Sequence, residues 1–214
     1  MKRLWLHPIP LRAWHWVNTA LVLFLMVTGI QLRAPDVEVF SSYRTAVVVH
    51  EAGGFVMAIS FLFWLFYTVM SKGARKQYMI HLSDVTGMAK QGEYYAFGVF
   101  QGWKNPFHAT AEAKFNPLQK FSYIFVQFLF TPIIVVTGIF FSNILFFGGA
   151  ISSIGGIRIL DAIHVTVAYV FAAYLFVHIY MSTVGHTPLT HVKAMFTGYE
   201  EEEETGRPGD SETR

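Results

Sequence analysis

The chain has 214 residues, of which 53% are hydrophobic, 17% aromatic and 14% charged, with a formal net charge of +2 and a mean hydropathy of +0.40. This composition is too apolar for an ordinary water-soluble domain and indicates an integral membrane protein. The sequence contains no cysteine, which excludes disulfides, thiolate-bound iron–sulfur clusters and covalent c-type haem, so a redox centre held by this chain alone must be non-covalent, with histidine as its natural ligand.

Four apolar segments are long enough to cross a hydrocarbon core of about 30 Å. The first follows a basic start without a cleavage pattern of small residues, so we expect it to be retained as a helix and not removed as a signal peptide. Pro132 lies inside the third segment and should kink it, because proline deletes a backbone donor. We therefore predict an all-α fold, an integral membrane four-helix transmembrane bundle with spans at residues 14–32, 47–70, 121–147 and 159–184.

The connections between the spans differ in length and character. Residues 71–120 form a long, mostly polar connection, in which residues 80–91 have the pattern of a helix at the membrane interface. Residues 148–156 are expected to form a glycine-rich loop. Residues 1–199 then make one transmembrane domain, and residues 200–214 are expected to form an acidic, disordered tail.

Lysine and arginine are concentrated on one side of this topology. The N-terminal segment and the long connection hold most of them, whereas the two opposite loops hold only Arg33, Arg44 and Arg158. By the positive-inside rule, both termini and the 71–120 connection are cytoplasmic. The basic residues of the N-terminal segment and of the long connection are Lys2, Arg3, Arg12, Lys72, Arg75, Lys76, Lys90, Lys104, Lys114 and Lys120.

Four histidines lie near the ends of the spans. His164 and His178 share the fourth span, fourteen residues apart. At about 1.5 Å and 100° per residue, this spacing separates the imidazoles by about 21 Å along the helix and keeps them within about 40° of one face. His15 opens the first span and His50 the second. The topology therefore pairs His15 with His178 on the inner side and His50 with His164 on the outer side.

Two histidine pairs at matched depths are the arrangement that two stacked haem irons require. An ionisable group inside a spanning helix costs about 2–3 kcal/mol on insertion scales, so it usually serves a function. We predict two haems b, each with the two histidines of one pair as axial ligands, which suits electron transfer because no coordination position stays open. Arg12, Arg44 and Arg158 stand near three of the ligands and are candidates to pair with haem propionates. The other histidines are expected to be solvated: His7, His81, His108, His186 and His191.

Two glycines occur in similar strings near the ends of two spans. Gly29 lies in VTGIQ and Gly138 in VTGIF. Glycine allows the close approach of a neighbouring helix or of a haem macrocycle. Ordinary helix packing explains the two strings equally well, and both interpretations stay open.

The residues resemble a known family. HW before an apolar run that ends in VTG, a histidine that opens the second span, KFNPLQK before the third, and two histidines separated by thirteen residues in the fourth are similar to the cytochrome b subunits of membrane-bound formate dehydrogenases. The same superfamily includes the b subunits of nickel-iron hydrogenase and thiosulfate reductase and the bacterial cytochromes b561. The resemblance covers residues 10–190, and KFNPLQK is typical of the formate dehydrogenase gamma type.

This resemblance implies a bacterial inner-membrane anchor that carries electrons from an extracytoplasmic iron–sulfur or multihaem cytochrome c subunit to quinone, either menaquinone or ubiquinone, near the cytoplasmic face. Its partners are then membrane lipid, quinone and that redox subunit, with no nucleic acid. In the family an asparagine before the third helix lies beside the quinone. Asn116 matches this position and is followed by Gln119 and Lys120. An asparagine before Pro117 is equally suited to cap a helix.

Two other functions remain open at this point. A stand-alone cytochrome b561 would oxidise a small extracytoplasmic donor itself, without a partner subunit. A proton channel or transporter without cofactor would line one pore with its histidines and would carry no chromophore.

Overall fold

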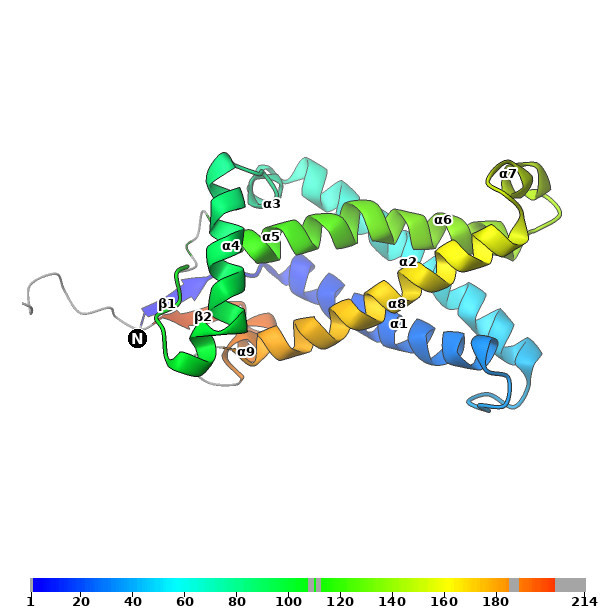
Figure 1. Cartoon of the computed structure of the whole chain (residues 1–214), viewed down its shortest axis with the longest axis horizontal. Coiled ribbons are helices and arrows are strands. Elements are labelled where there is room, and N and C mark those ends of the chain that lie inside the picture. The colour runs from blue at the N-terminus through cyan, green and yellow to red at the C-terminus, as the bar shows by residue number, and fades with distance from the viewer. Residues whose placement is uncertain (1, 108–109, 111–112, 185–188, 203–214) are drawn as a thin grey trace, which may run out of the picture.

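The computed structural model describes residues 2–107, 110, 113–184 and 189–202. Four long helical segments run along the molecule (Figure 1), and each is long and apolar enough to cross a membrane. They are α1 (Ile9–Arg33), α2 (Tyr43–Met70), the continuous run of α5 (Pro117–Ile124), η2 (Phe125–Phe130) and α6 (Thr131–Ser142), and α8 (Ile157–Ser182). The predicted all-α membrane bundle is thus confirmed.

Local sequence signals explain where these helices begin. Pro8 precedes α1, whose first turn contains a second proline, so the helix starts at Ile9 and not at residue 14. The Ser42 hydroxyl caps α2 by accepting a hydrogen bond from the backbone N–H of Thr45 at 3.1 Å. Gly156, with φ of 88°, lies directly before α8 in a conformation that favours glycine.

The third span starts and ends earlier than residues 121–147. It begins at Pro117, because Asn116 caps the helix there, and it ends at Ser142. Pro132 lies two residues after the end of the π-helical turn η2, and the backbone N–H of Thr131, the residue between them, bonds to the carbonyl of Val126. The Thr131 hydroxyl donates to the same carbonyl at 2.8 Å. The wider turn therefore adapts the helix to the backbone hydrogen bond that Pro132 cannot make.

The connection between the third and fourth spans is not the glycine-rich loop expected for residues 148–156. A turn over residues 143–147 is followed by the short helix α7 (Gly148–Ser153). The side chain of Ile151 is 4% exposed and packs α7 against the rest of the bundle. The expectation was wrong because two adjacent glycines at a helix start do not prevent a helix that one buried isoleucine holds in place.

The long connection after α2 folds over one end of the bundle, which we call the closed end. It contains α3 (Lys72–Gln77), α4 (Leu82–Ala96) and the 3-10 turn η1 (Gly98–Gln101), and α4 runs across the end of the bundle (Figure 1). The helix predicted at 80–91 therefore exists but extends to Ala96. Gly87 of α4 lies so close to Pro117 that an added methyl group would be 2.7 Å from the proline ring.

A buried ion pair fastens α4 to the third span. The Lys120 ammonium lies 2.7 Å from a carboxylate oxygen of Asp84, and both side chains are about nine-tenths buried. The same ammonium donates to the carbonyl of Met79 at 3.2 Å. Burial works against the charged carboxyl of Asp84, but hydrogen bonds from Lys120 and from the backbone N–H of His81 hold its pKa below the usual value.

Both described chain ends lie at the closed end. Strand β1 (Lys2–Trp5) pairs in antiparallel fashion with β2 (Tyr199–Glu202), which follows the short helix α9 (Thr190–Thr197). The sequence did not predict this sheet, and its assignment of Glu200 to a disordered tail was wrong, because Glu200 lies in β2. Residues 203–214 of that tail lie outside the described part of the chain. The cytoplasmic orientation of this end stays a prediction.

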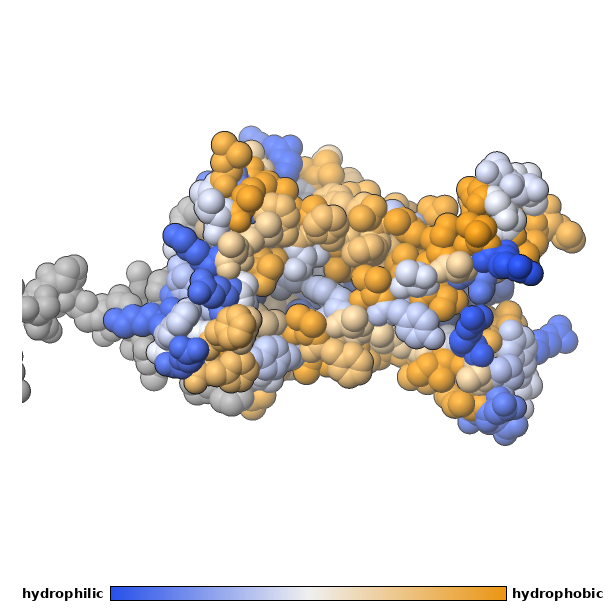
Figure 2. Space-filling view, in the orientation of Figure 1, coloured by the Kyte–Doolittle hydropathy of each residue, from blue (hydrophilic) through white to orange (hydrophobic). Residues whose placement is uncertain are grey.

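A cluster of aromatic rings packs the interior toward the closed end. Trp64 of α2 is 1% exposed and packs against Trp14, Tyr78 and Phe128, with ring centres 5.2–6.0 Å apart. By contrast, α8 has only two buried residues among those described, Leu160 and Val167. Figure 2 shows a broad apolar band around the middle of the molecule with polar residues gathered at both ends, as expected of a membrane-spanning bundle.

We expect Asp84→Asn to lower the free energy of unfolding by about 3 kcal/mol, because it leaves the Lys120 ammonium buried without a charged partner. Thermal unfolding in detergent micelles measures this loss. The double variant Asp84→Asn/Lys120→Met should recover most of it, since both buried charges are then gone. Because the pKa of Asp84 is lower when folded, its contribution is present above the unfolded pKa of about 4 and is lost at lower pH. Equal stability of Asp84→Asn and wild type would contradict this role.

Candidate functional site

The four predicted histidines meet in two pairs, one toward each end of the bundle. His15 of α1 faces His178 of α8 at the closed end, with ring centres 6.2 Å apart and planes inclined by 46°. His50 of α2 faces His164 of α8 at the opposite end, which we call the open end, with ring centres 6.4 Å apart and planes inclined by 69°. Helix α8 supplies one member of each pair, so the pairs lie along one side of it.

The separation within each pair fits one metal atom between two imidazoles. A metal–imidazole bond of about 2.0 Å, with about 1.2 Å from each bonded nitrogen to its ring centre, places two ring centres about 6.4 Å apart. At the closed end, His15 Nδ1 is buried and has no hydrogen-bond partner in the described part of the chain. Among the described residues, no further His, Asp or Glu joins either pair to form a site for a bare metal ion. The donor set therefore fits a planar iron cofactor that needs two axial ligands.

At the open end, two threonine hydroxyls hold the histidine rings. Thr28 Oγ lies 2.7 Å from Nδ1 of His50, and Thr137 Oγ lies 2.8 Å from Nδ1 of His164. Each threonine follows a valine and precedes a glycine, so the two VTG strings place the same groups around two different histidines. The sequence interpretation used only the glycines and missed the hydroxyls, although the repeated string was the signal that could have found them.

Gly29 and Gly138 lie against the imidazole edges. A methyl group added at either glycine would be 3.5 Å from Cε1 of the neighbouring histidine, which is His50 for Gly29 and His164 for Gly138. This distance is ordinary van der Waals contact, so each glycine borders a histidine ring, and the close approach of a haem macrocycle stays a prediction.

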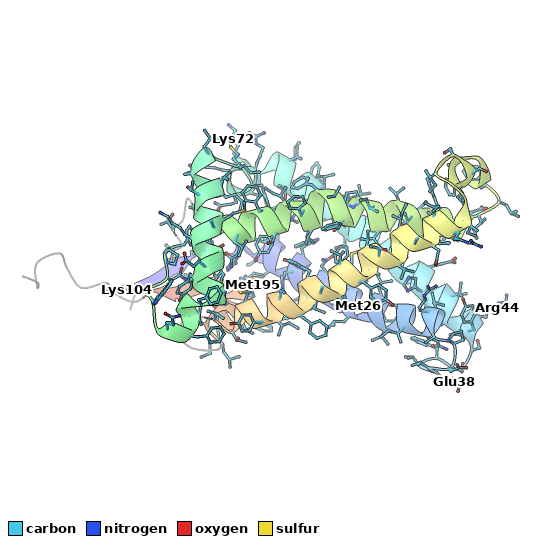
Figure 3. The ribbon with its side chains drawn as sticks, viewed as in Figure 1. Met26, Glu38, Arg44, Lys72, Lys104 and Met195 are labelled. Carbon is cyan, nitrogen blue, oxygen red and sulfur yellow. The ribbon has the colours of Figure 1, made fainter. Side chains whose placement is uncertain are left out.

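The three arginines expected near propionates have different surroundings. Arg12 donates to the carbonyl of Phe196 and lies over the ring of Trp5, while its Nε is buried without a described partner. Arg44 lies at the open end (Figure 3) and is exposed, as is Arg158. Arg33, which the sequence interpretation passed over, reaches Asp161 of α8 at 3.4 Å. Arg12 is thus the arginine with a free buried donor close to a histidine pair.

The candidate quinone residues have structural partners. Asn116 is 3% exposed, and its Oδ1 accepts from the backbone N–H of Gln119 at 2.8 Å, while Gln119 Oε1 accepts from the backbone N–H of Asn116. The Asn116 amide also donates to the hydroxyl of Tyr95 at 2.9 Å. Lys120 forms the ion pair with Asp84. The capping role considered from the sequence is therefore present, and a quinone contact by these residues stays a proposal.

Two of the histidines expected to be solvated are half-buried at the closed end. His191 lies 3.4 Å from the Glu200 carboxylate, and the hydrogen bond to Glu200 raises its pKa although burial acts against this. Burial and the nearby Lys114 ammonium lower the pKa of His7 to about 4. The expectation was wrong for both because the unpredicted sheet and α9 cover them. His81 is exposed, whereas His108 and His186 lie outside the described residues.

The fold and these pairs define a membrane-embedded bundle with a two-histidine site toward each end. A family model described as prokaryotic cytochrome b561 matches residues 6–198, and the chain belongs to that family. It is a cytochrome b561-type membrane cytochrome, an electron-transfer protein, and the family implies b-type haem. The chain is also 28% identical over 200 residues to a protein of Escherichia coli (strain K12) named "Putative cytochrome YdhU", a match that covers 92% of this chain and 75% of that protein.

The capping of α5 gives a prediction for Asn116. We expect Asn116→Ala to lower the free energy of unfolding by about 1 kcal/mol, because the first turn of α5 loses its side-chain acceptor. Asn116→Asp keeps that acceptor and should retain near-wild-type stability. Thermal unfolding of the purified protein in detergent compares the two variants. If the aspartate variant were as unstable as the alanine variant, the cap would not be the main role of this side chain in folding.

Proposed function

We propose that this cytochrome holds two b haems, with His15 and His178 as axial ligands at the closed end and His50 and His164 at the open end. The observation that carries the proposal is the separation of 6.2 and 6.4 Å between opposed rings in a chain of a b-haem family. When bound, each haem supplies a one-electron iron couple. Bis-histidine ligation leaves no position for a further ligand, which suits electron transfer.

The positions of the ligands on α8 set the distance that electrons would cross. His164 and His178 are fourteen residues apart in one continuous helix, which is about 21 Å along its axis. Most of the thickness of the hydrocarbon core would then lie between the two iron atoms. If the closed end is cytoplasmic, each electron that moves from the open to the closed end stores about 2.3 kcal/mol per 100 mV of membrane potential.

We infer that the chain is the quinone-reactive subunit of a larger oxidoreductase of the formate dehydrogenase gamma type. An iron–sulfur or multihaem cytochrome c subunit would deliver electrons at the open end, and quinone would react at the closed end. Asn116, Gln119 and Lys120 lie at the start of α5, in the closed end that holds His15 and His178. Lys120 also lines a small pocket of about 90 Å³, whose other walls include Gln77, His81 and Phe115. These groups support a site for a polar ring with carbonyl oxygens.

A channel or transporter without cofactor is less well supported. Its histidines would line one continuous path, whereas the rings here oppose each other in two pairs. A stand-alone cytochrome b561 is the second candidate, and the family description favours it as much as it favours a complex subunit. Purification from the native membrane separates the two, because only a subunit retains a redox partner.

The ligand pairs predict which haem each variant loses. We expect about two b haems per chain in a pyridine haemochrome assay, and a reduced-minus-oxidised spectrum with two components. His15→Ala and His178→Ala should remove the same component, and His50→Ala and His164→Ala should remove the other. Each pair serves as the control for the other pair. Loss of different components by His15→Ala and His178→Ala would show that the pairing is wrong.

The quinone proposal predicts a separate effect of Asn116. Asn116→Asp keeps the cap of α5 but replaces the amide donor with a carboxylate, which cannot donate to a quinone carbonyl. We expect both haems to be retained and quinone reduction to slow by about tenfold, the equivalent of one hydrogen bond of about 1.4 kcal/mol. The rate of haem reoxidation after addition of a quinone analogue measures this. An unchanged rate would leave Asn116 with its structural role alone.

A further inference from the structure

The two open-end histidines share a hydrogen-bond arrangement that is not found for His15 among the described residues of the closed end. Thr28 and Thr137 lie on different helices, yet each hydroxyl meets Nδ1 of one histidine, at 2.7 and 2.8 Å. Both threonines are buried, with 0% and 6% of their surface exposed. Since the arrangement occurs twice around the same pair, it is a property of this site and not of one helix.

The direction of these hydrogen bonds follows from the other partners of the hydroxyls. The Thr28 hydroxyl donates to the carbonyl of Phe24 at 3.0 Å, and the Thr137 hydroxyl donates to the carbonyl of Ile133 at 2.7 Å. A hydroxyl has one proton to donate, so toward the histidine it acts as an acceptor. Nδ1 of each imidazole must therefore carry its proton, and Nε2 keeps the lone pair that binds a metal.

At the closed end, His15 Nδ1 is buried and has no hydrogen-bond partner among the described residues. Donation from Nδ1–H to an oxygen makes an imidazole a stronger electron donor and favours the oxidised metal. Hydrogen bonds to ligands are one of the means by which a protein adjusts the reduction potential of a haem.

We propose that Thr28 and Thr137 are positioning residues that fix the ring orientation and proton position of His50 and His164 and thereby lower the reduction potential of the open-end haem below that of the closed-end haem. This inference rests on the proposed function, because it requires haem at both pairs. Its consequence is a direction of flow. An electron that enters at the open end moves toward the closed end, where the higher potential favours the reduced state.

The test replaces each hydroxyl by a methyl group of similar size. Thr28→Val and Thr137→Val remove the acceptor, while Thr28→Ser and Thr137→Ser keep it. Thr131→Val is the matched control, because Thr131 is also buried in the third span and bonds only to the backbone carbonyl of Val126. The full chain with its haems, in lipid nanodiscs, is titrated with redox mediators while the haem absorbance is followed. The same titration in the His178→Ala background reports the open-end haem alone.

We expect the lower of the two reduction potentials to rise by about 59 mV in each valine variant, which is a tenfold change in the one-electron equilibrium constant. The higher potential should stay unchanged. The serine variants and Thr131→Val should match wild type. If a valine variant loses its haem, the serine variant at the same position is the test. Reduction potentials equal to wild type in that serine variant support the proposal, and altered potentials overturn it.

Two haems with unchanged potentials in the valine variants, or an equal shift in Thr131→Val, would overturn the role of the threonines and leave the proposed function intact. A wild-type chain that binds no haem would overturn the proposed function itself. A rise of the higher potential in place of the lower one would refute the proposed direction of flow.

Discussion

The structure depends on the cost of placing an imidazole in a hydrocarbon environment. A ring nitrogen without a partner there is unfavourable, so a histidine in a span needs a polar group or a metal beside it. In this chain Thr28 and Thr137 meet Nδ1 of His50 and His164, and the ring centres of the two pairs lie 6.2 Å apart toward one end and 6.4 Å apart toward the other. Because α8 carries one ring of each pair, its position relative to α1 and α2 determines both separations at once.

The two ends of the bundle hold their histidine pairs in place in different ways. The closed end has most of the folded mass outside the spans, including the terminal sheet, α4, the Trp64 cluster and the Asp84–Lys120 ion pair. There the start of α1 is tied to α9, because Arg12 and Trp16 donate to the carbonyls of Phe196 and Met195. The open end has short connections, and there the rings are fixed from within by Thr28 and Thr137. The asymmetry gives two chemically similar pairs different surroundings.

The residues at the start of α5 show how structural and functional roles share one segment. Asn116 and Gln119 form a capping box, and Lys120 neutralises a buried carboxylate. A segment held this firmly keeps its polar groups in a fixed geometry, which is what recognition of a small polar ring requires. Its structural role is therefore no argument against a binding role. It does mean that experiments must separate the two, because removal of the side chain affects both.

The sequence by itself determined the number of spans, the all-α class and the pairing of the histidines, because hydrophobic length and the helical repeat are local properties. It missed the exact span ends, α7, the terminal sheet and the burial of His7 and His191, which depend on contacts between segments far apart in the chain. Strand β1 forms only because β2, nearly two hundred residues later, lies beside it. The threonine–histidine hydrogen bonds belong to the same class. VTG is visible twice in the sequence, but only the packing of α1 on α2 and of α6 on α8 brings each hydroxyl to a ring nitrogen.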